Sequence, residues 1–381
     1  MKIAILNDTH FGARNDSPAF IKYFSRFYDE IFFPYLQEHN ITTLIHLGDV
    51  VDRRKFINYN TAHNFQQKFW KRLWDMKIDT HIILGNHDTY YKNTNEINAM
   101  QQLITSHDGV NEPFIYEKPK TVNFDGLDIL FLPWIAPDIE EESIYAIDNS
   151  TAQIAMGHLE IKGFEMHKGH INEHGLEMQQ FNRFEKVISG HFHRKSDNGT
   201  IYYLGTQYEI TWSDYNCPKG FHIFDTQTRE LTRVPNPITM FEKIVYNDKK
   251  QSYSNIDISQ YKDKHIKVIV EEKTDTNMFG EFIDRLGSPI VVKNMKAKRR
   301  WRLWWQLLAI HEDGLGLGFK ELLEVLLIER LGQGALTYDV NAERKMEVEQ
   351  ATLVGAAISI QTQWRAYAES KNFAMRRMTM I

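Results

Sequence analysis

The chain has 381 residues, of which 42% are hydrophobic and 25% charged. These are ordinary values for a globular protein, and they exclude a disordered or fibrous chain. A single hydrophobic core rarely grows beyond about 250–300 residues, so we expect a main domain with smaller appendages. The net charge of −5 argues against a protein that coats nucleic acid through bulk positive charge. It leaves open a nuclease, because bound metal ions can supply positive charge to phosphate.

The cellular compartment is indicated by what the sequence lacks. The single cysteine, Cys217, excludes a disulfide framework and fits a reducing compartment. The N-terminus has no apolar run typical of a signal peptide, and no stretch of about 18 apolar residues is present. The sequence therefore predicts a cytoplasmic protein that does not bind membranes.

Short apolar runs alternate with longer amphipathic stretches along the first half of the chain, which predicts an α/β layered fold. Two of the stretches, residues 17–36 and 61–76, carry aromatic side chains at helical spacing and should be helices that face the core. The predicted strands are Lys2–Leu6, Thr43–Leu47, His81–Leu84, Ile129–Leu132, Ile154–Met156 and Val187–Ser189.

Strand and turn patterns follow residue 195. Residues 200–212 and 220–234 alternate aromatic and branched side chains, which predicts antiparallel strands that close one side of the sheet. Further on, a predicted strand at 265–271 and a predicted helix at 277–286 form a small α/β unit. We therefore expect a main domain over residues 1–245 and a small unit over 246–294.

Residues 295–381 differ in composition from the rest of the chain. They are rich in alanine and arginine and open with the basic, tryptophan-rich run KAKRRWRLWW. We expect a helical tail that is either a distinct module or a junction with unrelated coding sequence.

Five of the six predicted strands run directly into residue types that bind metals. The carboxyl ends of strands in an open α/β sheet form the crevice where ligands bind, so these side chains should converge. Carboxylate oxygens, imidazole nitrogens and an amide oxygen suit divalent ions such as manganese, iron or zinc. The five segments are NDTHFG with Asp8 and His10, GDVVD with Asp49 and Asp52, GNHD with Asn86, His87 and Asp88, GH with His158, and GHFH with His191 and His193. In GHFH, the alternation of a strand end should send both histidines to one side.

These five segments, complete and in order, resemble the signature of the calcineurin-type metallophosphoesterases. Within that superfamily, DTHFG, GDVVDRRK and GNHDTYYKN resemble the meiotic-recombination-eleven and SbcD nucleases, including the small recombination-endonuclease subunits of T-even-type phages. The resemblance covers residues 1–240 well and 241–294 weakly. It implies a layered metallophosphoesterase fold, with mixed β-sheets flanked by helices and a small capping unit.

The resemblance also implies two divalent metal ions, expected to be manganese. Asp8, His10, Asp49 and His193 would hold one ion, and Asp49, Asn86, His158 and His191 the other. His87 would lie beside the pair as the catalytic residue, stabilising the transition state or protonating the leaving oxygen. Asp52 and Asp88 would orient the histidines.

The implied activity is that of a DNA nuclease, with 3′-to-5′ exonuclease and single-strand endonuclease action, in a recombination and double-strand-break repair complex. The family resemblance also implies a homodimer and an SbcC-type ABC ATPase partner with a coiled coil, in the host cytoplasm if the chain is phage-encoded. The leucine-rich stretch 307–331 could bind that partner, or the tail could pack on its own chain.

Six basic or aromatic residues directly follow two of the metal segments. They could contact DNA, or they could form a plain solvated rim. The six are Arg53, Arg54, Lys55, Tyr90, Tyr91 and Lys92.

Two other functions remain as alternatives at this point. The first is a phosphatase or phosphodiesterase that acts on small substrates with the same metals. The second is a scaffold that keeps the fold without catalysis, which would be expected to lose ligands, whereas here all of them are present.

Overall fold

The computed structural model of the chain describes residues 1–104, 112–167, 169–287 and 290–294. The chain divides into two compact units, Met1–Phe241 and a second unit that begins at Glu242. The predicted tail, including the leucine-rich stretch 307–331, lies outside the described residues. Among the residues described, no helix is both long enough and apolar enough to cross a membrane.

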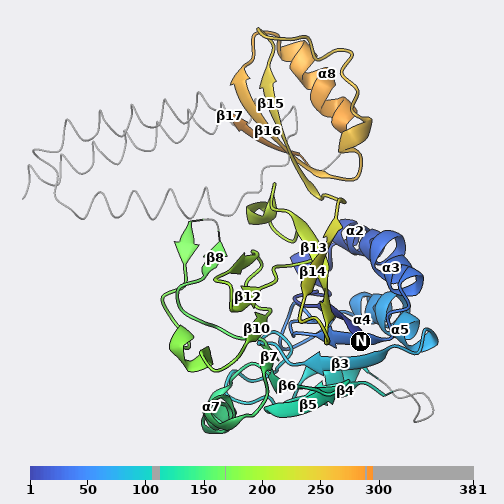
Figure 1. Cartoon of the computed structure of the whole chain (residues 1–381). Coiled ribbons are helices and arrows are strands. Elements are labelled where there is room, and N and C mark those ends of the chain that lie inside the picture. The colour runs from blue at the N-terminus through green and yellow to red at the C-terminus, as the bar shows by residue number, and fades with distance from the viewer. Residues whose placement is uncertain (105–111, 168, 288–289, 295–381) are drawn as a thin grey trace, which may run out of the picture. The chain divides into compact units, whose positions relative to one another are not determined.

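The first unit is built on two six-stranded sheets (Figure 1). The first sheet has the order β14-β13-β1-β2-β3-β4, in which β1 to β4 run parallel and β13 pairs antiparallel with both β1 and β14. The predicted closure of this sheet by an antiparallel pair is therefore confirmed. The strands are β1 (Lys2–Leu6), β2 (Thr43–His46), β3 (Asp79–Ile83), β4 (Phe114–Tyr116), β13 (Lys219–Asp225) and β14 (Leu231–Asn236).

The second sheet has the order β11-β12-β10-β7-β6-β5. Its central strands β6, β7, β10 and β12 run parallel, and antiparallel strands close both edges. The strands are β5 (Lys120–Phe124), β6 (Leu127–Leu132), β7 (Ile154–Gly157), β10 (Lys186–Ser189), β11 (Ser196–Asp197) and β12 (Ile201–Tyr203), and a separate two-stranded ribbon joins β8 (Glu165–His167) to β9 (His170–Ile171). All six strands predicted from apolar runs are present, within about two residues at each end.

The two sheets bury one face each against the other. Alternation along β1 shows this directly, because Ile3 and Ile5 belong to the core between the sheets while Ala4 and Leu6 belong to the core under the helices. A third core lies on the outer face of the second sheet, where α7 (Glu140–Asn149) contributes Ile147. The order of layers is thus helix, sheet, sheet, helix, which agrees with the predicted layered α/β fold.

Two long helical segments cover the first sheet, close to the predicted ranges. One comprises α2 (Pro18–Phe27), the π-helical turn η1 (Tyr28–Phe32) and α3 (Phe33–Glu38), and the other α4 (Tyr59–Phe65), η2 (Gln66–Trp70) and α5 (Lys71–Asp75). Each segment contains one π-helical turn, and in the first segment Pro34, which has no backbone N–H, lies at the start of the helix that follows the turn. The shorter elements are α1 (Ala13–Asp16), α6 (Ala99–Leu103), η3 (Pro137–Ile139), η4 (Met178–Phe181), η5 (Trp212–Asp214) and η6 (Ser259–Tyr261).

The prediction for residues 200–212 was wrong over most of its length. Only Ile201–Tyr203 forms a strand, and the chain then runs irregularly to the short helix Trp212–Asp214. Gly205 has φ of +70°, which interrupts an extended backbone. The alternation reflects burial instead, since Tyr208 is fully buried and its hydroxyl donates to the Thr9 carbonyl at 2.6 Å.

Within its described residues, the second unit contains a three-stranded sheet in the order β15-β16-β17, the helix α8 and the short helix η6. Its core includes Tyr246, Tyr253 and Phe282, which is what an independent small α/β unit requires. The elements are β15 (Phe241–Asn247), β16 (His265–Glu272), α8 (Thr276–Leu286) and β17 (Ile290–Asn294). The predicted strand at 265–271 and helix at 277–286 are present.

Candidate metal centre

The candidate ligands lie on loops that follow the carboxyl ends of strands from both sheets. Asp8 and His10 follow β1, Asp49 follows β2, and Asn86 and His87 follow β3; His158 follows β7 of the second sheet, and His191 and His193 follow β10. Hydrogen bonds join these loops, with Asp8 N–H donating to the Gly48 carbonyl at 2.9 Å and His10 N–H to the Asp49 carbonyl at 3.1 Å. The loops therefore hold side chains that are distant in sequence at one place.

The backbone at the site is held in an uncommon conformation. Four of the candidate ligands lie in the left-handed region, which residues other than glycine rarely adopt: φ is 49° at Asp8, 43° at His10, 53° at Asp49 and 81° at His191. Such conformations are costly and persist where surrounding contacts enforce them, which is typical of functional sites. The prediction that strand alternation sends His191 and His193 to one side was wrong. Gly190, His191 and Phe192 lie beyond the end of β10, so strand alternation does not direct the two histidines.

The first group of candidate ligands is Asp8, His10 and His193. The Nε2 atoms of His10 and His193 are 3.0 Å apart, and the Oδ1 atom of Asp8 lies 3.9 Å from the first and 3.8 Å from the second. This Asp8 oxygen is buried and has no hydrogen-bond partner. A buried carboxylate oxygen without a partner is costly, and a cation among these atoms would remove the cost.

The second group is Asp49, His158 and His191. The Nε2 atom of His158 lies 3.4 Å from Asp49 Oδ2, 3.2 Å from His191 Nδ1 and 3.0 Å from Asn86 Oδ1. Asp49 Oδ2 is also 3.8 Å from His10 Nε2, so this carboxylate lies between the two groups. The structure thus brings together all seven residues predicted to bind metal.

Two glycines permit this close approach. A Cβ atom on Gly85 would lie 2.2 Å from the Asp49 backbone nitrogen. A Cβ atom on Gly48, where φ is +88°, would lie 2.7 Å from His158 Nδ1. Both distances are shorter than van der Waals contact, so the site excludes any side chain at these positions.

Burial and the charges within the site shift the pKa values of its histidines in opposite directions. Burial opposes the charged form of His158, but the adjacent Asp49 carboxylate outweighs it and raises the pKa to about 9. Burial lowers the pKa of His191 to about 3, and the neighbouring His158 charge adds to the effect. Burial likewise lowers the pKa of His10 well below its usual value. In the metal-free protein, His158 and Asp49 therefore form a buried ion pair beside neutral imidazoles.

His87 lies beside the ligand groups. Its backbone N–H donates to Asp49 Oδ1 at 2.7 Å, and its ring is 5.0 Å from that of His10. The ring Nδ1 lies 2.6 Å from the Asp52 carbonyl oxygen. Because a carbonyl can only accept, Nδ1 carries the proton and Nε2 is left for other partners. The Asp52 carboxylate lies 3.5 Å from His10 Nδ1, so Asp52 contacts two of the histidines.

Asp88 has a different contact from the one predicted. Its carboxylate accepts from the backbone N–H groups of Val50 at 2.8 Å, Val51 at 3.1 Å and Gly85 at 2.9 Å. Asp88 therefore joins two loops through their amides and does not hold a histidine ring. Asp88 points inward from the turn after His87, where donors from both loops converge on one acceptor.

The predicted DNA-contacting residues follow two of the metal segments in sequence and have different partners. Arg53 forms an ion pair with Asp16, while Nη1 of Arg54 is buried without a hydrogen-bond partner. Tyr90 is 38% exposed, with the Lys55 ammonium 5.8 Å from its ring centre. Lys92 is exposed. Exposure and charge of this kind are compatible with phosphate or base contacts.

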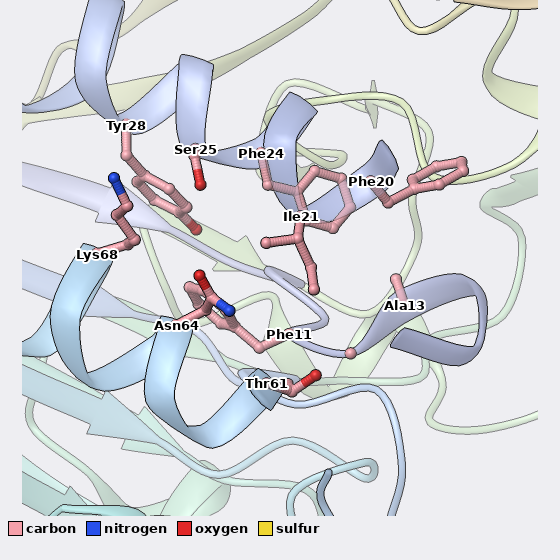
Figure 2. A pocket seen from close by; sticks show the side chains of 11 residues that line it. Phe11, Ala13, Phe20, Ile21, Phe24, Ser25, Tyr28, Thr61, Asn64 and Lys68 are labelled. Atoms are coloured by element: carbon pink, nitrogen blue, oxygen red, sulfur yellow. The ribbon is translucent and has the colours of Figure 1, made fainter. Parts of the chain in front are cut away.

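Some contributors to the site were not predicted from the sequence. The Trp134 ring packs 5.3 Å from that of His191, and the Asn7 amide donates to Asp8 Oδ2 at 2.6 Å. Asn7 directly precedes Asp8, which is the one sequence signal that could have found it. An apolar pocket between α2 and α4, lined by residues such as Phe11, Phe24 and Thr61, contains none of the candidate ligands (Figure 2).

The fold and the site agree with a family comparison. Residues 1–195 match the family model described as calcineurin-like phosphoesterase. The chain belongs to this family, and its histidine and aspartate groups are consistent with the dimetal site of a metallophosphoesterase.

The chain is also similar to individual proteins. The chain is homologous to "Exonuclease subunit 1" of Enterobacteria phage T4, with 35% identity over 278 residues, which is 73% of this chain and 79% of the relative. It is 28% identical over 98 residues to the SbcD component of the nuclease SbcCD from Staphylococcus epidermidis, covering 24% of this chain and 26% of the relative. A solved archaeal phosphodiesterase matches 62% of this chain and 100% of its own length at 16% identity, with a TM-score of 0.32 that is too low to support a conclusion.

Proposed function

We propose that this protein is a DNA nuclease that hydrolyses phosphodiester bonds with two divalent metal ions. The observation that carries the proposal is the convergence of two ligand groups on Asp49, with His87 beside them. Homology to an exonuclease subunit over 79% of that relative supports DNA as the substrate.

The residues present fit two divalent cations. Asp8, His10, Asp49 and His193 would hold one ion, and Asp49, Asn86, His158 and His191 the other. The mixture of carboxylate, imidazole and amide donors suits manganese, which we propose as the metal. When bound, such a pair activates water and stabilises the charge that develops on the phosphate oxygens.

His87 would act on the substrate. Its Nδ1–H is held by the Asp52 carbonyl, so the ring is oriented and its Nε2 atom is left for the phosphate. In the protonated form Nε2 can stabilise a phosphate oxygen or donate its proton to the departing oxygen. Asp52 and Asp88 would maintain the loops on which His10 and His87 lie.

DNA would enter along the rim that carries Arg53, Arg54, Tyr90 and Lys92. Positive side chains position the phosphates and aromatic rings stack on unpaired bases, so this rim suits a strand end or a single strand. We propose 3′-to-5′ exonuclease and single-strand endonuclease activity, by analogy with the family.

The protein would act as one subunit of a recombination complex. The T4 relative is named as a subunit, as is the staphylococcal one. The chain contains no GxxxxGK[ST] sequence, so an ATPase activity would have to be supplied by another chain. We propose an SbcC-type ABC ATPase with a coiled coil as the partner and a homodimer of this chain.

The direct test is hydrolysis of a short end-labelled duplex in the presence of Mn²⁺. Wild type should release nucleotides only with the metal, and Asp49→Ala and His87→Ala should abolish the release. His39→Ala is a matched control, because this exposed histidine lies at the end of α3. Turnover of bis-p-nitrophenyl phosphate without cleavage of DNA, even after the ATPase partner is added, would instead favour a small-substrate phosphodiesterase.

A further inference from the structure

Lys219, the first residue of β13, places a buried positive charge next to the candidate metal centre. Its side chain is only 3% exposed and pairs with Asp214 at 2.7 Å. The ammonium group has three donors, and each has an acceptor: Asp214 Oδ1 at 2.7 Å, Thr206 Oγ1 at 2.7 Å and the carbonyl of His193 at 3.0 Å. One donor of this buried lysine is thus directed at the backbone of a candidate metal ligand.

The carbonyl of His193 is held from a second direction by the same segment. The backbone N–H of Thr206 donates to it at 3.2 Å. Gly205 makes this approach possible, because a Cβ atom there would lie 2.7 Å from the Lys195 nitrogen and 3.1 Å from the His193 oxygen. The backbone after GHFH is therefore packed directly against residues 205–206.

Asp8, another member of the first ligand group, is tied to this segment as well. The Asn7 amide donates to the Gly205 carbonyl at 3.0 Å and to Asp8 Oδ2 at 2.6 Å. Two of the three residues in the first group, Asp8 and His193, thus depend on the loop that Lys219 and Asp214 hold in place.

The second ligand group is held in a different way. His158 Nδ1 donates to the Leu47 carbonyl at 2.8 Å, and Asp49 accepts from the His87 amide. A direct link between the groups is the His191 N–H, which donates to Asp8 Oδ2 at 3.0 Å. Loss of Lys219 should therefore affect the first group most.

We propose that Lys219 is a positioning residue that fixes His193 and thereby sets the affinity of the first metal ion separately from the second. The proposal rests on the two-metal site proposed above. It assigns to the segment 204–219 a role in the affinity of the first site, since an ion bound by a loosened ligand set should dissociate more readily.

A purely structural role for the buried ion pair is the alternative, and Glu209 supplies the matched control. Its buried carboxylate lies in the same segment and accepts from the Met240 and Phe241 amides at 2.6 and 2.9 Å. Glu209→Gln should therefore disturb the fold of this segment without touching a candidate ligand.

The experiment is titration of the metal-free full-length protein with Mn²⁺ alone, followed by calorimetry and by electron paramagnetic resonance. We expect wild type and Glu209→Gln to bind two ions with the same two affinities. Lys219→Met should lose at least tenfold in affinity at one site and keep the other. If this variant fails to fold, Lys219→Met/Asp214→Asn removes both charges while the Asn oxygen can still accept from the Ile210 and Thr211 amides.

Each remaining outcome overturns the proposal. Unchanged affinities in both Lys219 variants would show that Lys219 does not position His193. Equal weakening of both sites, or the same weakening in Glu209→Gln, would reduce Lys219 to a structural role. Wild type that binds no Mn²⁺ would overturn the two-metal function itself, which separates the failure of one proposal from that of the other.

Discussion

His87 Nδ1 donates a hydrogen bond to the backbone carbonyl of Asp52 at 2.6 Å. The bond links the turn after β3 to the turn after β2, and it fixes which ring nitrogen of His87 carries the proton. Because the acceptor is a backbone oxygen, no substitution of the Asp52 side chain can remove it directly. The catalytic role of His87 can therefore be tested separately from the metal-binding role of its neighbours.

His87→Gln should lower kcat by about 10²–10⁴-fold, the usual contribution of a general acid or base. Manganese binding should be unchanged, because the proposed ligand set does not include His87. The two measurements are the rate of nucleotide release and the calorimetric metal stoichiometry. Loss of one bound ion together with the activity would instead show that His87 is a metal ligand. The geometry would permit this, because His10, Asp49 and His87 are also close enough together to hold an ion.

Asp88→Asn should destabilise the protein. Three backbone N–H groups donate to the two carboxylate oxygens of Asp88, and an asparagine would replace one of these oxygens with an NH₂ group, which cannot accept. Leaving a buried polar group unsatisfied costs about 1–3 kcal/mol, measurable as a lower denaturant midpoint. Asp75→Asn is the control: this exposed carboxylate pairs with Lys71 on the helix surface, where such a pair contributes about 0.3–0.5 kcal/mol. Equal effects of the two substitutions would contradict the assigned role.

The affinity for Mn²⁺ should rise with pH between about 6.5 and 9. In the metal-free protein the pKa of His158 is raised to about 9 by Asp49, so a proton must leave before the ring can bind metal. The folding stability depends on pH in the opposite direction. Because the pKa of His158 is higher in the folded protein than in the unfolded chain, the stabilisation is complete below the unfolded pKa near 6.5 and is lost as the pH rises through about 9. Calorimetry in buffers of different ionisation enthalpy should show proton release on binding, and its absence at pH 7 would contradict the His158–Asp49 ion pair.

Lys92→Ala should weaken binding of DNA uniformly across sequences and lower the salt slope by about one unit, if Lys92 neutralises one phosphate. The measurement is binding to a labelled single strand at several salt concentrations, with Ca²⁺ in place of Mn²⁺ to limit hydrolysis. Lys71→Ala is the control, since this exposed lysine on α5 pairs with Asp75. The same salt slope in both variants would show that Lys92 does not contact a phosphate and lies on a plain solvated surface.

Local sequence patterns were sufficient to predict six strands and the residue types that follow them. Apolar runs such as Lys2–Leu6 and Val187–Ser189 are typical of buried strands, and polar residues that follow such strands lie at the edge of the sheet. The same patterns did not predict residues 204–212, because buried irregular backbone and strand share the same aromatic and branched composition.

The division of the ligands into groups was implied by the family resemblance and not by local patterns, and its physical basis, like the contacts that support the ligands, is tertiary packing. His191 and His193 are two residues apart, yet one lies with His158 and the other with His10, because the left-handed backbone at His191 turns the chain between them. The contact of Lys219 with the His193 carbonyl joins residues 26 positions apart. The contacts of Asp88 with Val50 and Val51 join the turns after β2 and β3. Such contacts depend on how whole sheets pack together, which local sequence patterns do not encode.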